Sequence, residues 1–182
     1  LTMAGVEVDG YESFNSKITG KDSIIKLDIT PNRGDCFSVY GIARELAVIN
    51  NLKFKHPNFT KIKVSFKEDL KIKVCKEAPR YVGRSLRNID IKAKTLPLVA
   101  ERLLLSDQKL IDPVVDITNY ILLELGQPLH AFDRDKLEGN IYVRKAKNGE
   151  NLTLLDDQDV KLSSDYVVIS DKKKSIALAG IM

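Results

Sequence analysis

A helix with both of its ends marked is the feature that most constrains this fold. In the stretch IDPVVDITNYILLELGQP, Asp112 is placed to cap a helix and Pro113 suits its first turn. Gly126, followed by Pro128, ends the helix, since glycine accepts the left-handed conformation common at helix C-termini. One face of this helix is apolar and carries Val114, Ile117, Ile121 and Leu125. Another face should be exposed and carry Asp116, Asn119 and Tyr120.

After this helix the pattern changes to short strands separated by turns. The stretches NIYVRKA, NLTLLD, QDVKLSS, DYVVIS and SIALAGI each have strand character. Turn-forming residues separate them, as at Asn148, Gly149 and Asp171. We expect an antiparallel or mixed sheet in this part of the chain.

Upstream of the helix, strands and helices alternate. The stretch IIKLDIT, from Ile24, alternates as a half-buried strand would, and Pro31 with Asn32 stops it. Residues 36–49 have the apolar spacing of an amphipathic helix with Asp35 as its N-cap, and a further helix is expected from Leu96 to Leu105.

Two other segments are predicted to form strands, and the first twenty residues are predicted to form a connection. Residues 51–77 are rich in lysine and have a period of two in Ile62, Val64 and Phe66, which suggests edge or surface strands. Arg80 to Ile91 again reads as a strand, with Gly83 at a bulge or a close contact. The first twenty residues have the composition of a turn-rich connection.

These elements predict an α+β fold, with mixed or antiparallel sheets packed with a few helices. We divide the chain into an N-terminal remnant and linker, residues 1–23, and one domain, residues 24–182.

Composition narrows the class of protein. Hydrophobic residues make up 43% and charged residues 30%, which suits a folded globular unit and argues against disorder. The apolar runs are too short to span a bilayer and no signal peptide is visible, so we expect a cytoplasmic protein without a membrane partner. Cys36 and Cys75 lack metal-ligand spacing, and no metal site is predicted. The net charge of +4, with the lysines scattered, permits an acidic partner but does not require one.

Local motifs exclude some chemistries. The triplet Arg-Gly-Asp within PNRGDC suggests cell adhesion, but the cytoplasmic composition makes that match accidental. No glycine-rich phosphate loop is present, so nucleotide hydrolysis in this segment has no support. His56 lies in a lysine-rich connection and is interpreted as an exposed loop residue.

His130, in GQPLHAFD, has two interpretations. The turn at Gly126 to Pro128 can fold the chain back so that His130 faces the preceding helix, where Thr118 and Asn119 would line one cleft with it. The alternative is a structural histidine whose hydrogen bonds are satisfied within the fold.

The motifs LDITPNRGDC, GIARELA, PRYVGR, IDPVVDITNYILLELGQPLHAFD, NLTLLDDQ and ALAGIM occur in this order. In that order and at these spacings, they resemble the β subunit of bacterial phenylalanyl-tRNA synthetase, from Ile24 to Met182. The resemblance implies the editing module of that subunit, which hydrolyses tyrosine wrongly attached to phenylalanine tRNA. A separate editing site is needed because a pocket that binds phenylalanine discriminates against tyrosine, which adds one hydroxyl, by only about a hundredfold.

The resemblance also implies roles for particular residues. His130 corresponds to the editing histidine, which would orient the attacking water or hold the terminal ribose, and Thr118 and Asn119 line the same pocket. The segment Ala177 to Met182 forms another wall, where Ala179 and Gly180 leave room for the substrate and offer backbone groups. An activated ester needs only a positioned water and hydrogen-bond donors for the developing oxyanion.

The whole enzyme that the resemblance implies is a phenylalanine-tRNA ligase. Its partners are a catalytic α subunit in a heterotetramer, which carries ATP and Mg²⁺, and phenylalanine tRNA. No cofactor is expected within this segment. Two departures from the family pattern favour a second hypothesis, a non-catalytic structural or RNA-binding scaffold. A short linker from Gly10 to Ile24 stands where the family has an OB-type tRNA-binding module, and residues 107–110 replace the usual Gly-Ile-Arg-Ser. In the family, the acidic residue thought to read the tyrosine hydroxyl lies beyond the position of Met182, so this segment is expected to hold only part of the pocket.

Overall fold

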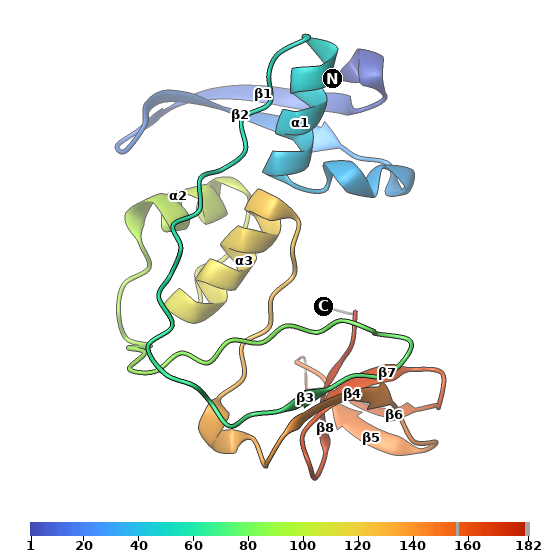
Figure 1. Ribbon diagram of the computed structural model, residues 1–182. Coiled ribbons are helices and arrows are strands. Elements are labelled where there is room, and N and C mark those ends of the chain that lie inside the picture. The colour runs from blue at the N-terminus through green and yellow to red at the C-terminus, as the bar shows by residue number, and fades with distance from the viewer. Residues whose placement is uncertain (156, 181–182) are drawn as a thin grey trace. The chain divides into compact units, whose positions relative to one another are not determined.

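The structure is a computed structural model that describes residues 1–155 and 157–180, and it separates into two compact units (Figure 1). Unit 1 combines residues 1–60 with 89–131, and unit 2 combines residues 61–88 with the chain from residue 132 onward. Helices and mixed sheets are both present, which confirms the α+β class. The predicted involvement of Asp156 in a strand end, and of Ile181 and Met182 in a pocket wall, lies outside the described residues.

Unit 1 begins with a β-hairpin. After a 3-10 turn at Thr2–Ala4 (η1), strand β1 (Glu7–Ser16) pairs antiparallel with β2 (Gly20–Asp28). The predicted turn-rich connection over the first twenty residues is therefore wrong. Most side chains of β1 are exposed, so its sequence has no period-two apolar signal. Strand β2 also runs without a break through the boundary that we placed between residues 23 and 24.

Three helices complete unit 1, and α3 (Pro113–Leu125) contacts both α1 (Val39–Ile49) and α2 (Pro97–Leu105), as Figure 1 shows. The ends of α3 are confirmed. Asp112 accepts hydrogen bonds from the N–H groups of Val114 and Val115 at 2.8 and 3.0 Å. Gly126 closes the helix in the left-handed conformation, with φ of 72°.

The start of α1 differs from the prediction. The helix begins at Val39 and its N-cap is Ser38, which accepts from the N–H of Gly41, whereas Asp35 lies in a separate 3-10 helix, η2 (Pro31–Cys36). Position 41 must be glycine, because a β-carbon there would overlap the carbonyl oxygen of Asp35. This close approach places η2 directly against the first turn of α1.

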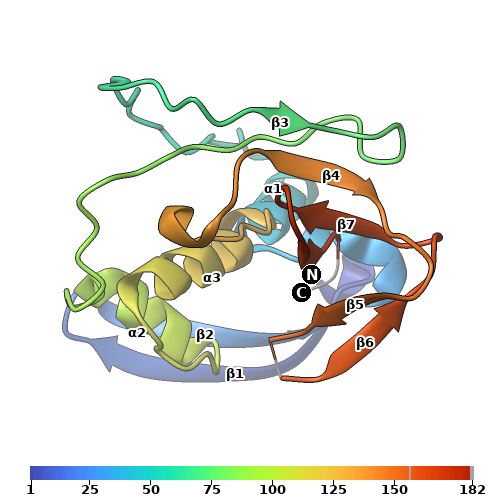
Figure 2. The ribbon, with the colours of Figure 1, turned by 90° about the horizontal axis from the view of Figure 1, so that it is seen from below.

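Unit 2 is built on a four-stranded mixed sheet in the order β3-β4-β7-β8, and Figure 2 labels the first three of these strands. Strand β3 (Ile72–Lys73) is parallel to β4 (Ile141–Lys145), and β7 (Val167–Ser170) is antiparallel to both β4 and β8 (Ser175–Leu178). Strands β5 (Glu150–Thr153) and β6 (Asp159–Leu162) form a separate hairpin. A 3-10 turn, η3 (Arg134–Lys136), precedes β4. The five strands predicted after α3 are confirmed.

Two apolar clusters hold unit 2 together. The β5–β6 hairpin contributes Leu152 and Leu162 to one cluster, where they pack with Ala146 and Val168. Ile141, Val143 and Ile169 form the other cluster. Each buried aliphatic side chain of this kind stabilises the fold by about 1.5 to 3 kcal/mol.

The strands expected across residues 51–77 and Arg80 to Ile91 are mostly absent, and only Ile72 and Lys73 form a ladder. The period of two describes burial only in part, since Phe66, Leu70 and Ile72 are half-buried but Ile62 and Val64 are 73% and 70% exposed. An apolar period of two marks side chains that could face a core, but it does not show that a covering layer or an aligned partner strand is present.

Candidate functional site

Helix α3 carries two of the predicted site residues, Thr118 and Asn119, and both are half-buried. The hydroxyl of Thr118 donates to the carbonyl of Val115 at 2.7 Å, one turn earlier in the same helix. This local bond is typical of threonine within a helix and satisfies the hydroxyl donor, leaving the oxygen able to accept from a ligand.

Asp116, which we expected on an exposed face of the helix, is buried with 1% of its surface exposed. Its carboxylate accepts hydrogen bonds from the Thr95 hydroxyl and, at 2.9 Å, from the N–H of Ile111. The expectation failed because these donors come from the chain that precedes the helix, so the polar residue faces inward with its bonds satisfied. Asp116 therefore fixes the entry to α3 and does not lie on an exposed face of the helix.

His130 lies on the connection after α3, four residues beyond Gly126, and it is exposed. The left-handed turn at Gly126 sets the direction of this connection. Exposure argues against a histidine sealed in apolar packing. It leaves the ring accessible to a ligand.

Ala179 and Gly180 follow β8 in unit 2. Ala179 packs against the cluster around Ile141, and its N–H donates to the carbonyl of Val167 at 2.9 Å. Gly180 has φ of 77°, and a β-carbon built there meets no atom within 4 Å. The space beside Gly180 is therefore open, as it is beside several other turn glycines of the chain. Thr118, Asn119 and His130 belong to unit 1, whereas Ala179 and Gly180 belong to unit 2.

A polar cluster that the sequence did not reveal lies in PNRGDC, where Arg33 is the centre. Its guanidinium donates to both carboxylate oxygens of Asp35, each at 3.0 Å, and to the carbonyl of Ala4 at 2.9 Å. It also pairs with Glu45 of α1 at 3.1 Å. The Arg-Gly-Asp triplet therefore joins η1, η2 and α1, which is a structural role.

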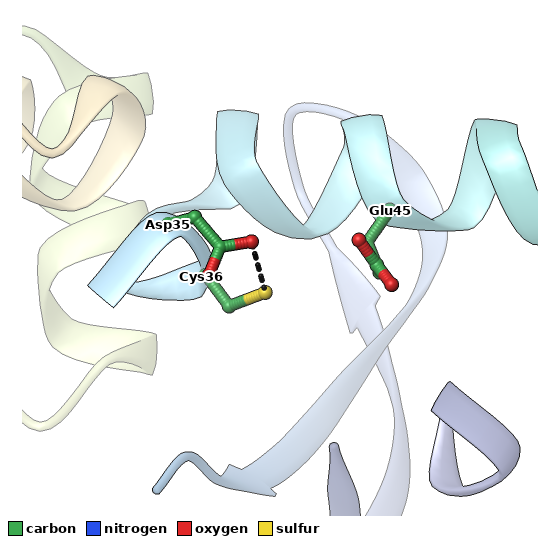
Figure 3. A group of neighbouring side chains, drawn as sticks. All are labelled: Asp35, Cys36 and Glu45. Carbon is green, nitrogen blue, oxygen red and sulfur yellow. Dashed lines mark hydrogen bonds between the residues drawn. The ribbon is translucent and has the colours of Figure 1, made fainter. Parts of the chain in front are cut away.

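Figure 3 shows Asp35, Cys36 and Glu45, whose donor atoms lie within 4.8 Å of one another, as in a metal site. The Arg33 guanidinium already supplies the positive charge, since it bonds Asp35, Glu45 and the Cys36 sulfur, the last at 3.0 Å. A hydrogen bond from Arg33 lowers the pKa of Asp35 to about 2, whereas burial raises the pKa of the Cys36 thiol. The positive charge that neutralises this cluster therefore already comes from Arg33.

His56 also has a partner that the sequence did not indicate. The Tyr40 hydroxyl lies 2.8 Å from His56 Nδ1, and the Phe54 ring packs edge-on against both rings. His56 is exposed, as predicted, but it attaches the segment after α1 to the first turn of that helix. Its role is therefore structural in this arrangement.

Unit 2 contains one further polar network. Arg144 of β4 pairs with both oxygens of Glu150, at 2.9 and 2.6 Å, and the hydroxyl of Ser175 donates to Glu150 at 2.6 Å. The bond from Arg144 lowers the pKa of Glu150 to about 2. The network joins β4, β5 and β8.

One shallow depression in unit 1 does not coincide with the predicted site. It is open to solvent, it has a volume of about 460 Å³, and Thr95, Asp112 and Asp116 are among its lining residues. Thr118, Asn119 and His130 are not among them. The carboxylates of Asp112 and Asp116 are already bonded to backbone and hydroxyl donors, so the depression offers no obvious anchor for a ligand.

Comparison with known proteins gives consistent matches. The B3/4 domain matches residues 77–182. The phenylalanine–tRNA ligase beta subunit of Idiomarina loihiensis is 47% identical over 172 residues, which cover 93% of this chain and 22% of that protein. The corresponding subunit of Acinetobacter baylyi is 49% identical over 162 residues, covering 88% of this chain and 20% of that protein. The subunit of Methylococcus capsulatus is 49% identical over 163 residues, covering 88% of this chain and 21% of that protein.

The chain thus spans about a fifth of the length of these curated relatives. None of the helices among the described residues combines the length and the apolar character that crossing a bilayer requires.

Proposed function

Because the chain belongs to the B3/4 domain family, we propose that it works as part of a phenylalanine-tRNA ligase and hydrolyses tyrosine wrongly attached to phenylalanine tRNA. The observation that carries the proposal is His130, an exposed imidazole directly after α3. It stands within IDPVVDITNYILLELGQPLHAFD, one of the stretches that resemble the β subunit of the synthetase, and its exposure would let it reach a visiting aminoacyl ester.

The chemistry suits the residues proposed for it. An activated ester requires a positioned water and donors for the developing negative charge, and it does not require a strong nucleophile. His130 would orient the water or hold the terminal ribose, while Thr118 and Asn119 would contact the substrate from α3.

We further propose the partners of the assembled enzyme. A catalytic α subunit would carry the aminoacylation site with ATP and Mg²⁺, and the complex would act on phenylalanine tRNA in the cytoplasm. The names of the relatives support the ligase assignment, since each is the beta subunit of a phenylalanine–tRNA ligase.

A second candidate function is a scaffold that holds the synthetase or RNA without editing. One observation favours it, because the Thr118 hydroxyl donates to its own helix at 2.7 Å and so already has a structural partner. In that case, His130 and Thr118 would contribute only to packing.

A deacylation assay separates the two functions. The substrate is phenylalanine tRNA charged with tyrosine, and the enzyme is the complete subunit assembled with its α subunit. We expect His130→Ala to slow hydrolysis at least tenfold while assembly of the complex is unchanged. His56→Ala is the matched control, since it removes the chain's other histidine, which is also exposed. Equally fast hydrolysis by His130→Ala and the unaltered enzyme would refute the role of His130, and hydrolysis by neither would favour the scaffold.

A further inference from the structure

The positive charge of the chain is concentrated in one segment. Residues 61–88 contain nine Lys and Arg against three Asp and Glu, a net charge of +6, whereas the whole chain carries +4. The remaining residues are together slightly acidic. A local excess of this size attracts an anionic partner to unit 2 rather than to the molecule in general.

The fold sorts these charges by face. Phe66, Leu70 and Ile72 are half-buried, and the last two pack against the cluster around Ile141. Alternate positions point the other way, so the side chains of Lys67, Lys71 and Lys73 share the exposed face with one acidic side chain, that of Asp69. Successive lysines at 71 and 73 are then about 7 Å apart along the strand direction.

The segment that follows β3 lies beside it and extends this face (Figure 2). A β-carbon at Gly83 would come within 3.0 Å of Ile72 Cδ1, and Arg87 lies 4.2 Å from the centre of the Phe66 ring. Gly83 therefore faces the inner side chains, and its neighbour Arg84, which is exposed, faces outward with the lysines.

Most of the nearby acidic groups are neutralised by other partners. Glu68 lies 3.4 Å from Arg87 and 3.7 Å from Arg134, and Glu77 pairs with Lys145 at 3.4 Å. Among the residues that the structure describes, Lys67, Lys71 and Lys73 form no ion pair. Their charges are therefore available to a partner.

An aromatic ring adjoins the charges. Lys73 pairs with Tyr142 across the parallel β3–β4 ladder, and its Nζ lies 5.8 Å from the centre of the Tyr142 ring. We call Lys67, Lys71, Lys73, Arg84 and Tyr142 the basic face.

We propose that the basic face binds the phosphate backbone of an RNA. Lysine is depleted at interfaces between proteins, but it is a common phosphate contact, where a flexible point charge suffices. Three of the five residues are lysines. This inference rests on the proposed function in one respect, namely that the RNA is phenylalanine tRNA. The rival explanation is that the lysines only keep an exposed strand from pairing with other chains.

The test measures binding of fluorescein-labelled phenylalanine tRNA to the complete subunit, assembled with its α subunit, at several salt concentrations. The variant replaces Lys67, Lys71 and Lys73 with Gln. The matched control replaces Lys161, Lys172 and Lys174 with Gln, since these are also exposed lysines of unit 2 and remove the same charge. A third variant carries Arg at positions 67, 71 and 73, and unfolding midpoints show that each variant folds.

We expect the Gln variant at positions 67, 71 and 73 to bind at least tenfold more weakly than its control. The slope of log K against log salt should fall by about two to three, since each phosphate contact contributes about 0.7 to 0.9. The Arg variant should restore binding. Equal affinity of the Gln variant and the control for the RNA would overturn the proposal. It would also be overturned if polyglutamate competed for the three lysines more strongly than unlabelled RNA does.

The same samples distinguish this proposal from the editing function. If the unaltered enzyme fails to hydrolyse mischarged tRNA but its binding still depends on the three lysines, editing is refuted and the basic face stands. If hydrolysis at saturating tRNA depends on His130 but binding is indifferent to the lysines, the basic face is refuted and editing stands.

Discussion

Gly126, at the end of α3, lies against Ser38, the N-cap of α1. A β-carbon at position 126 would come within 3.3 Å of both Cβ and Oγ of Ser38. Ser38 Oγ also accepts the hydrogen bond that starts α1. The turn that directs the chain toward His130 is thus held by the first turn of another helix.

We predict that Gly126→Ala destabilises the protein more than a left-handed conformation alone explains. The conformation costs about 1 to 2 kcal/mol for a residue with a β-carbon. Gly5→Ala is the control, because Gly5 is also left-handed, with φ of 77°, but a β-carbon there meets nothing within 4 Å. The free energy of unfolding, measured in urea, should fall further for Gly126→Ala. Equal losses would show that the Ser38 contact adds nothing.

Asp116 should be more important for stability than its helical neighbours. Asp116→Ala leaves the Thr95 hydroxyl and the Ile111 N–H without their acceptor, at a cost of about 1 to 3 kcal/mol in the free energy of unfolding. Thr95→Val should lower the free energy of unfolding less in the Asp116→Ala variant than in the unaltered protein, because the two side chains interact. Strict additivity in this double-mutant cycle would contradict the interaction.

Acid should weaken unit 2 through Glu150. Its pKa falls from an ordinary 4.5 to about 2 in the folded protein, so the folded state favours the charged form. The resulting stabilisation is complete above pH 4.5 and is lost as the pH falls from 4.5 toward 2.

Glu150→Gln should therefore flatten the decline in unfolding midpoint across this pH range. Glu138→Gln is the control, since Glu138 makes an exposed pair with Lys173 of the kind that contributes little. An unchanged pH profile in Glu150→Gln would refute the assignment.

Arg33 should tolerate no substitution, including lysine. A single ammonium cannot reach the Ala4 carbonyl, both oxygens of Asp35 and Glu45 together, so Arg33→Lys should lower the thermal unfolding midpoint. Arg44→Lys is the control, because Arg44 makes one longer bond, at 3.4 Å, to the Asp35 carbonyl. Similar midpoints for the two variants would mean that the fork geometry of Arg33 is unimportant.

Helix α3 was predictable because its cap, its proline and its terminal glycine are all local signals. The start of α1 was not, because Asp35 is taken by Arg33 and the capping role passes to Ser38. Strand β1 was missed because its side chains are largely exposed, so it lacks the alternation that identified IIKLDIT, in β2, as a half-buried strand.

In the candidate site, too, local sequence signals were predictable and contacts between distant residues were not. His130, Thr118 and Asn119 could be named from sequence because they lie in one continuous stretch. The inward turn of Asp116 depends on Thr95, twenty-one residues away, and the Tyr40–His56 pair spans sixteen. Such pairings depend on how the chain folds back, and spacing along the sequence does not contain that information.

The parallel pairing of β3 with β4 joins Ile72 to Ile141, and helices α2 and α3 of unit 1 lie between them in the chain. During translation, at about 5 to 20 residues per second, β3 leaves the ribosome roughly 3 to 14 s before its partner exists. The nascent lysine-rich segment must stay unpaired for that time. The sheet of unit 2 can therefore form only after the whole of unit 1 has been synthesised.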